Sequence, residues 1–343
     1  MIENAHIMSL PVISVVIVAY KRRQYIETAI LSAFNQTLDK RYYEIIVVKD
    51  FTDAKIDGLI EKIGCKSIIV DEKNYGIKLA IALDIAKGMI ITPLDDDDLF
   101  TPEKLSKIMT QFNENKRLIL IHNAHNVMYP NGRIGRGLHH VPTSSIYYDT
   151  EKQDRKSLTK LISYEPYFNF SSISFKKDIF EKSIFLSTDL SGGYDTAIFI
   201  LALSSKGFIE VNPEVMTIYR LHNSTSSLVS DDETFSRFKL DWYKRYTSSI
   251  STIRKQSTKF NFITNKFIDC LLIESKLNIL ILSNEKIQLE SIVHYIWNFV
   301  RCKFCISLTK FAFLIILLTI RMVSQKVSRN LYLLNFKRSK FKN

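Results

Sequence analysis

Glycine, proline and cysteine are scarce in this chain, which has 10 Gly, 7 Pro and 4 Cys among 343 residues. So few turn-forming residues count against a loop-rich all-β fold. Four cysteines are too few for a disulfide scaffold, so a reducing compartment is expected. Hydrophobic residues at 46% and charged residues at 24% are ordinary globular values, which exclude wholesale disorder and a collagen-like fibre. The N-terminus carries Glu3 and shows no basic segment followed by an apolar core, so we expect no signal peptide and a cytoplasmic protein.

Acidic residues are absent after Glu290, whereas ten of the 47 Lys and Arg residues lie there. The net charge of +12 is therefore concentrated in the tail, because residues 1–290 hold 37 basic and 35 acidic residues and carry only +2. A nearly neutral body with a basic tail indicates that the tail meets an anionic surface. The tail is rich in long aliphatic side chains and shows no nucleic-acid-binding motif, so lipid is expected and nucleic acid is not.

Residues 304–320 (FCISLTKFAFLIILLTI) form an apolar stretch with one charge, Lys310, and basic residues on both sides. Its 17 residues fall short of the roughly 20 that a membrane-spanning helix needs. The favoured hypothesis is a helix lying in the headgroup plane, with Trp297 inserted and the basic residues of 291–343 on anionic lipid. A core helix of a C-terminal bundle and a true membrane span are the alternatives. The first hypothesis places the protein peripherally at the cytoplasmic face of a membrane.

Strand and helix patterns alternate in the first hundred residues, which predicts an α/β fold with a mostly parallel sheet. Glycine and proline then disappear from about residue 235 onward, and apolar residues recur at helical spacing. We therefore predict an α/β domain over residues 1–230 and a helical, basic region over 231–343. The expected strands are residues 13–19, 44–48, 67–70 and 89–92, and the expected helices are residues 27–34, 57–63 and 78–86.

Four consecutive aspartates, Asp95 to Asp98, follow the buried strand predicted at residues 89–92. Ligand sites of open α/β sheets lie at such strand ends. On an extended backbone Asp95 and Asp97 point the same way, so they could share Mg²⁺ or Mn²⁺ with substrate phosphates. The alternative is an acidic, solvated turn before the helix that Pro102 and Glu103 open.

Several short motifs occur here in the order seen in family 2 glycosyltransferases of the GT-A fold, which the chain resembles over roughly residues 11–225. The resemblance implies a GT-A-type nucleotide-binding sheet flanked by helices. It also implies inverting transfer of a sugar from a nucleotide-diphospho-sugar to a glycan or lipid-linked hydroxyl, with a divalent metal on the diphosphate. The motifs are ISVVIVAY (13–20), EIIVVKD (44–50), NYG (74–76), AKG (86–88), LDDDDL (94–99), YFNFSSISFKK (167–177), GYD (193–195) and YRLHNS (219–224).

Carried over onto this sequence, Asp95-x-Asp97 occupies the DxD element of the family. Asp97 would hold the metal, and Asp95 would lie near the ribose and sugar and share the ion. Asp96 joins the donor-binding set, and Asp98 would either support the metal-binding residues from behind or contact the donor sugar. His222 is the third metal candidate, since imidazole joins carboxylates around Mn²⁺; the alternative is a loop histidine without a ligand.

Further resemblance assigns the nucleotide and diphosphate contacts. Tyr20 matches a nucleobase-packing position, with ordinary strand-end packing as the alternative. Asp50 matches the acid that reads the base, although the family commonly has two acids there and this chain has Lys49 first. Lys78 and Arg220 are expected beside the diphosphate, because cations pair with phosphate oxygens.

Asp195 is the predicted general base, which inverting transfer needs in order to take the proton of the acceptor hydroxyl. The family usually has Glu-Asp at this position, whereas this chain has Tyr194-Asp195. The alternative is that Asp195 only caps the following helix, and Asp189 is the reserve base. Two other functions remain open: a membrane-docked, inactive scaffold and a sugar nucleotidyltransferase. The second lacks the expected glycine-rich loop after the first strand.

Overall fold

The computed structural model of the chain describes residues 11–20, 23–137, 140–180, 190, 192–222, 232–284, 290, 292–293, 295–297 and 308–340. The reserve base Asp189, Lys342 of the tail and the predicted boundary between residues 230 and 231 lie outside these residues.

The first half of the chain alternates strands and helices as predicted, with small shifts at their ends. Apolar, β-branched runs form the strands and are buried on both faces, as in a parallel sheet covered by helices. The strands are β1 (Ile13–Val18), β2 (Tyr43–Lys49), β3 (Lys66–Ile69) and β4 (Ile90–Asp95). The helices are α1 (Ile26–Phe34), α2 (Ala54–Ile63) and α3 (Tyr75–Ile85).

β4 is longer than predicted, because it continues through Pro93 to Asp95 instead of ending before the proline. β9 pairs with β4 only at Ile90 and Ile91, so the strand at Pro93 has β1 as its neighbour on one side. A missing backbone N–H is tolerated at such a partly unpaired position. The aspartates consequently start within the strand.

Ten strands form one sheet in the order β3-β2-β1-β4-β9-β6-β10-β5, with β7 on β6 and β8 on β10. β1, β2, β3 and β4 are parallel, and β9 runs antiparallel to both β4 and β6. β6 and β10 are parallel to each other, so they share the direction of β4 and end at the same edge. The later elements are β5 (Leu99–Phe100), α4 (Lys104–Glu114), β6 (Leu118–Met128), β7 (Ile134–Arg136), β8 (Ile146–Asp149), α5 (Arg155–Ile162), β9 (Ile173–Lys176), α7 (Tyr194–Ser204) and β10 (Phe208–Arg220).

Helices cover both faces of the sheet, so two hydrophobic clusters form, as expected of an α/β fold. One cluster joins Val15 and Ile17 of β1 to α1, α2 and α4. The other joins Val16 and Val18 to α3, α7 and the C-terminal helices. Alternate residues of β1 thus point into opposite layers.

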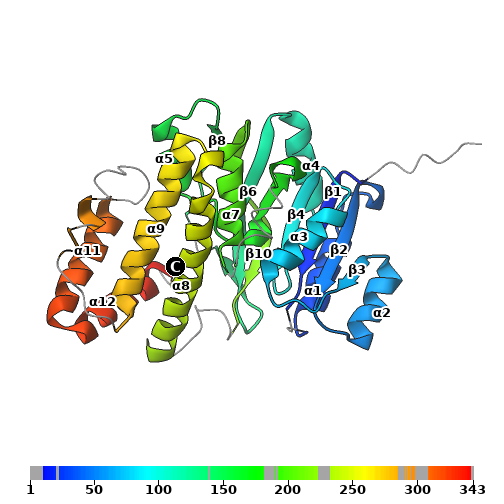
Figure 1. Ribbon diagram of the computed structural model, residues 1–343. Coiled ribbons are helices and arrows are strands. Elements are labelled where there is room, and N and C mark those ends of the chain that lie inside the picture. The colour runs from blue at the N-terminus through cyan, green and yellow to red at the C-terminus, as the bar shows by residue number, and fades with distance from the viewer. Residues whose placement is uncertain are drawn as a thin grey trace, which may run out of the picture.

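The C-terminal region is helical over its described residues, as predicted. It consists of α8 (Asp232–Lys255), α9 (Phe262–Leu282), α11 (Leu308–Val323) and α12 (Gln325–Lys340). Figure 1 shows these helices at the side of the molecule opposite β3 and α2.

α11 carries most of the apolar stretch of the tail and has two different faces. Phe311, Leu314 and Leu318 are buried in the cluster shared with α9, as in the core-helix alternative. Ile316 and Val323 instead are 56% and 91% exposed. Among the helices that the structure describes, none combines the length and apolarity needed to cross a membrane.

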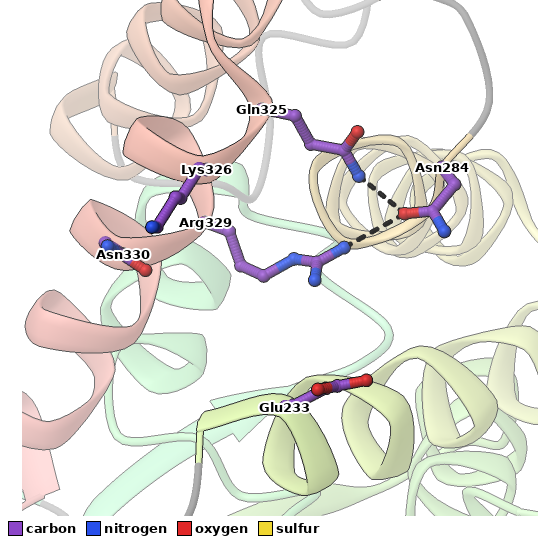
Figure 2. A pocket seen from close by; sticks show the side chains of 6 residues that line it. All are labelled: Glu233, Asn284, Gln325, Lys326, Arg329 and Asn330. Carbon is purple, nitrogen blue, oxygen red and sulfur yellow. Dashed lines mark hydrogen bonds between the residues drawn. The ribbon is translucent and has the colours of Figure 1, made fainter.

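Two side chains of α12 donate hydrogen bonds to backbone carbonyls at the C-terminal end of α9. Arg329 donates to Leu282 O at 3.3 Å, and Gln325 donates to Ser283 O at 3.0 Å. Both side chains also donate to Asn284 Oδ1, on the wall of a polar cavity of about 460 Å³ (Figure 2). These bonds satisfy carbonyl groups that a helix end leaves without intrahelical partners.

Candidate active site

Most of the predicted site residues follow the carboxyl ends of the parallel strands and so meet at one edge of the sheet. Tyr20 follows β1, Asp50 follows β2, and the aspartates end β4. Arg220 ends β10, with His222 two residues later. The structure thus brings together side chains from positions 20 to 222, as the rule for ligand sites of open α/β sheets predicts.

The aspartates form a tight turn, in which Asp98 N donates to Asp95 O at 3.1 Å. The expectation that Asp95 and Asp97 point the same way off an extended backbone is therefore wrong beyond the end of β4. Their carboxylates have separate partners. Asp95 Oδ1 accepts from Tyr75 Oη at 3.0 Å, and Asp97 Oδ2 lies 2.7 Å from His222 Nε2.

Asp97 and His222, two of the three predicted metal ligands, therefore contact each other although 125 residues separate them. Both side chains are buried, and the ring of Tyr25 packs on the imidazole at 5.3 Å. Within the described part of the chain, no three or more His, Cys, Asp or Glu side chains are grouped as a metal site.

Arg220 holds the aspartate turn in place. Its backbone N–H donates to Asp98 Oδ1 at 2.9 Å, and its Nε donates to Asp97 O at 2.7 Å. The guanidinium lies 4.7 Å above the ring of Tyr25. The predicted role beside a diphosphate stays a prediction, and the observed contacts are with the protein itself.

The predicted nucleotide-contacting residues form a second group beside the turn. Lys78 is fully buried; its Nζ donates to Ala19 O at 3.0 Å and lies 3.3 Å from Asp50 Oδ2. The same ammonium lies 5.0 Å from the ring centre of Tyr20, whose backbone N–H donates to Asp96 Oδ2 at 3.2 Å. Burial lowers the pKa of Lys78, and the charge of Asp50 opposes this change.

Lys104 is a buried lysine next to the aspartate turn, and the sequence pattern did not predict it as part of the site. Lys104 has no exposed surface, and its Nζ donates to Asn123 Oδ1, Ser171 O and Thr217 Oγ1 at 2.6 to 3.0 Å. Burial lowers the pKa of Lys104 well below its usual range, opposed by the charge of Asp98. Burial, reinforced by Asp97 and Asp95, raises the pKa of Asp98 well above its usual range. Lys104 is the first residue of α4, and nothing in the sequence around it distinguished it from an ordinary residue at the start of a helix.

Asp195 lies in the first turn of α7, where Gly193 is the N-cap. The alternative of Asp195 as the N-cap is therefore wrong, although its Oδ1 accepts from Thr196 N at 2.7 Å. Burial raises the pKa of Asp195 to about 7; the Thr196 N–H opposes this shift and the nearby charge of Asp95 adds to it. A carboxyl group with a pKa near 7 suits general acid–base chemistry near neutral pH.

An aromatic contact connects Asp195 with the aspartate turn. The ring of Tyr194 stacks on that of Tyr75, with centroids 4.4 Å apart, and the Tyr75 hydroxyl is bonded to Asp95. Burial raises the pKa of Tyr75 well above its usual range, so the phenol remains a proton donor to Asp95. The NYG motif contains Tyr75, but its spacing did not reveal this bond.

Comparison with known proteins agrees with this geometry. The model of the family described as Glycosyl transferase family 2 matches residues 14–179. A Haemophilus influenzae protein described as an uncharacterized glycosyltransferase is 26% identical over 304 residues, which cover 83% of this chain and 90% of that protein. These matches agree with the resemblance to family 2 glycosyltransferases that the sequence predicted, and the chain has the predicted GT-A type of fold.

Two further relatives extend the comparison. The minor teichoic acid biosynthesis protein GgaB of Bacillus subtilis is 26% identical over 255 residues, which cover 69% of this chain and 27% of GgaB. S. aureus TarS 1–349 in complex with UDP-GlcNAc superposes with a TM-score of 0.54 at 14% identity, covering 96% of this chain and 93% of that chain. At such low identity the second comparison shows the shared fold. The comparisons identify the chain as a glycosyltransferase.

Proposed function

We propose that this enzyme transfers a sugar, with inversion and metal assistance, from a UDP-sugar to a hydroxyl group of a glycan. The observation that carries the proposal is the convergence of Asp97, His222, Asp95 and Asp195 around one edge of the sheet. These side chains supply both charge stabilisation for a departing nucleoside diphosphate and a base for the acceptor. UDP is proposed because S. aureus TarS, which shares the fold, binds UDP and UDP-GlcNAc.

The nucleotide half of the donor is assigned to the group formed by Tyr20, Asp50 and Lys78. Tyr20 is 39% exposed at the end of β1, so its ring is accessible for packing against a nucleobase. Asp50 Oδ2 lies 3.3 Å from Lys78 Nζ, and a carboxylate can accept hydrogen bonds from the N–H groups of a base.

Asp97 and His222, with Asp95 nearby in the same turn, would hold a divalent cation. Carboxylate oxygen and imidazole nitrogen are suitable ligands for Mn²⁺, and Mg²⁺ or Mn²⁺ commonly takes its other ligands from substrate phosphates and water. A grouping of two contacting side chains therefore fits an ion that the diphosphate completes. When bound, the ion supplies positive charge to the departing diphosphate.

Asp195 is the proposed base. Its raised pKa keeps it basic enough to accept the acceptor hydroxyl proton while the donor carbon is attacked from the opposite face. Tyr194, the neighbour of Asp195, stacks on Tyr75, and Tyr75 donates to Asp95 of the aspartate turn. These contacts fix the position of the proposed base relative to the donor-binding residues.

A thermal-shift screen of the full chain against UDP and GDP, with and without Mn²⁺, tests the donor assignment. Ligands that bind the folded state raise the melting temperature by mass action. We expect UDP with Mn²⁺ to stabilise the protein more than UDP alone or GDP does. Stabilisation by GDP but not by UDP would overturn the uridine assignment. If UDP stabilised the protein equally with and without Mn²⁺, the proposed metal ion would be overturned.

We also propose that the exposed face of α11 and α12 contacts an anionic membrane. Val323, Val327 and Leu334 are between 49% and 91% exposed, and basic side chains such as Lys326 lie beside them. An apolar strip with a basic border fits a headgroup region that takes up both kinds of side chain. Binding at a membrane would suit a lipid-linked acceptor.

Flotation with vesicles of phosphatidylcholine and phosphatidylglycerol tests this contact. Deleting the tail would expose the buried face of α11, so the informative variant is the double substitution Val323→Glu and Val327→Glu. We expect it to lose vesicle binding, while Ile69→Glu, at an exposed position on β3, keeps it. Unchanged binding of the double variant would contradict the docking surface.

A further inference from the structure

The polar cavity between α8, α9 and α12 shares no described residue with the proposed active site (Figure 2). Its volume of about 460 Å³ lies in the range of small-molecule sites. Every described residue that lines it is polar or charged, so the cavity is not a gap in the apolar core. These residues are Glu233 of α8, Asn284 after the end of α9, and Gln325, Lys326, Arg329 and Asn330 of α12.

Arg329 has more hydrogen-bond donors than the described protein groups use. A guanidinium offers five N–H groups. Both bonds of Arg329 to described residues, to Leu282 O and to Asn284 Oδ1, come from Nη2 alone. Its Nε is buried and donates to no group in the described part of the chain. Unsatisfied buried donors cost free energy, so a ligand oxygen that reaches this guanidinium would be bound favourably.

The charges of the cavity favour an anion. Lys326 and Arg329 line it, and Glu233 on the facing helix is the one acid among the described lining residues. Neither cation forms an ion pair with a carboxylate that the structure describes. The first turn of α12 contains no acidic residue, so the positive end of its helix dipole adds to this charge. Donors from Gln325 and Arg329 already occupy the terminal carbonyls of α9, which would otherwise repel an anion.

The donors of the cavity come from two helices, which suits an anion with several oxygens. Asn284 accepts from Gln325 and Arg329 through Oδ1, and its Nδ2 donates to no described residue. The Asn284 amide thus offers N–H groups from the end of α9, while Lys326 and Arg329 offer theirs from α12. Phosphate accepts hydrogen bonds on three or four oxygens at once, and Arg and Lys are its usual partners.

The cavity lies beside the apolar strip proposed to contact the membrane. Lys326 and Asn330 are one turn apart on α12, and both line the cavity and are exposed. Val327 directly follows Lys326, and Leu334 lies two turns further along; these side chains are 49% and 51% exposed. A surface that buries the two apolar side chains in lipid would therefore bring the headgroup layer to the edge of the cavity.

We propose that this cavity binds the phosphate group of an anionic lipid headgroup and thereby fixes the orientation of α12 on the membrane. The inference rests on the membrane contact proposed above, in which Val323 and Val327 enter the lipid. It adds one defined polar site to a surface that would otherwise bind through general charge and apolarity.

Flotation of the full chain with three kinds of vesicle tests the site. The vesicles contain phosphatidylcholine alone, phosphatidylcholine with phosphatidylglycerol, or phosphatidylcholine with cholesteryl hemisuccinate, a carboxylate lipid. The two anionic vesicles are adjusted to the same zeta potential. We expect binding to phosphatidylglycerol to exceed binding to the carboxylate lipid by about fivefold, because only the phosphate presents enough oxygens for donors on both helices. Phosphatidylcholine alone should bind least, since its trimethylammonium group would face Lys326 and Arg329.

Substitutions in the cavity should remove this preference. Lys326→Gln and Arg329→Gln should each bring the ratio between the two anionic vesicles close to one. Lys62→Gln, an equal loss of charge at an exposed position of α2, should leave the ratio unchanged. Lys326 donates to no described residue, so its variant tests the site without disturbing the fold. Equal binding of the wild type to both anionic vesicles, or an unchanged ratio in Lys326→Gln, would overturn the phosphate site and leave the general membrane contact standing.

The water-soluble headgroup separates this inference from the membrane contact. Phosphorus NMR of glycerophosphoglycerol, without metal or nucleotide, reports binding to the protein as line broadening. We expect broadening by the wild type and by the double variant Val323→Glu and Val327→Glu, and its loss in Lys326→Gln. No broadening by the wild type, or equal broadening by Lys326→Gln, would overturn the site. Broadening by a wild-type protein that binds no vesicle would refute the membrane contact and, with it, the lipid as the source of the phosphate.

Discussion

Asp195→Asn should abolish sugar transfer and at the same time stabilise the protein. The carboxyl pKa is raised from 3.8 to about 7 by burial, so the folded state binds the Asp195 proton more tightly than the unfolded chain does. The contribution of this proton to stability is complete below pH 4 and is lost as the pH rises through about 7. Above pH 7 the native state therefore carries a half-buried, poorly solvated carboxylate, which costs free energy.

The size of the effect follows from the shift. Three pKa units at about 1.4 kcal/mol each correspond to about 4 kcal/mol, an upper value because the amide keeps a weaker bond with Thr196 N. The gain in unfolding free energy of the variant should be about 2 kcal/mol at pH 5 and about 4 kcal/mol at pH 8. Loss of a general base typically lowers turnover by about 10² to 10⁴.

Urea unfolding at pH 5 and pH 8, together with turnover at saturating donor, measures both effects. In the wild type, turnover should rise with pH around an apparent pKa of about 7, since the base must be deprotonated. Asp178→Asn, at an exposed position, is the control and should change neither quantity. Normal transfer by the Asp195→Asn variant would refute the assignment of Asp195 as the general base. A stability difference that does not grow with pH would refute the raised pKa of the Asp195 carboxyl group.

Three further substitutions test other parts of the site and the fold. Asp97→Asn should remove the Mn²⁺-dependent part of UDP stabilisation in thermal shift, because a neutral amide binds the ion poorly; retained metal dependence would exclude this ligand. Lys104→Met should lower the unfolding free energy by about 2–4 kcal/mol in urea, since three buried acceptors lose their donor; Lys107→Met, at a half-exposed position paired with Glu214, should cost less than about 1 kcal/mol. Arg329→Ala should cost about 1–2 kcal/mol through the uncapped end of α9, with Lys326→Ala on the same cavity nearly neutral.

Much of the donor side could be predicted because it depends on local patterns and one general rule. Buried β-branched runs identify β1, β2 and β4, and parallel strands end at a shared edge. Residues at or directly after the ends of those strands, such as Tyr20, Asp50 and Asp95, must then be neighbours. Details of the backbone were harder: the aspartates turn instead of extending, and Gly193 rather than Asp195 is the N-cap.

Contacts between distant segments could not be read from spacing. Lys104 has the sequence context of an exposed helix start, yet it is fully buried under the aspartate turn because Asn123, Ser171 and Thr217 offer three acceptors there. Periodicity shows which face of an element is apolar, but it carries no information about which segment covers that face.

The amino-acid sequence by itself determined the α/β order, the carboxylate-bearing edge of the sheet, the resemblance to family 2 glycosyltransferases and a helical basic tail. Only the tertiary structure decided that His222 meets Asp97, and that one face of α11 packs on α9 while the other remains exposed. It also decided that Trp242, Tyr246 and Glu274 surround the proposed base. The physical reason is that hydrophobic burial is non-directional: an apolar stripe can pack equally well on lipid or on another helix, and the choice depends on the shape and charge of the partner.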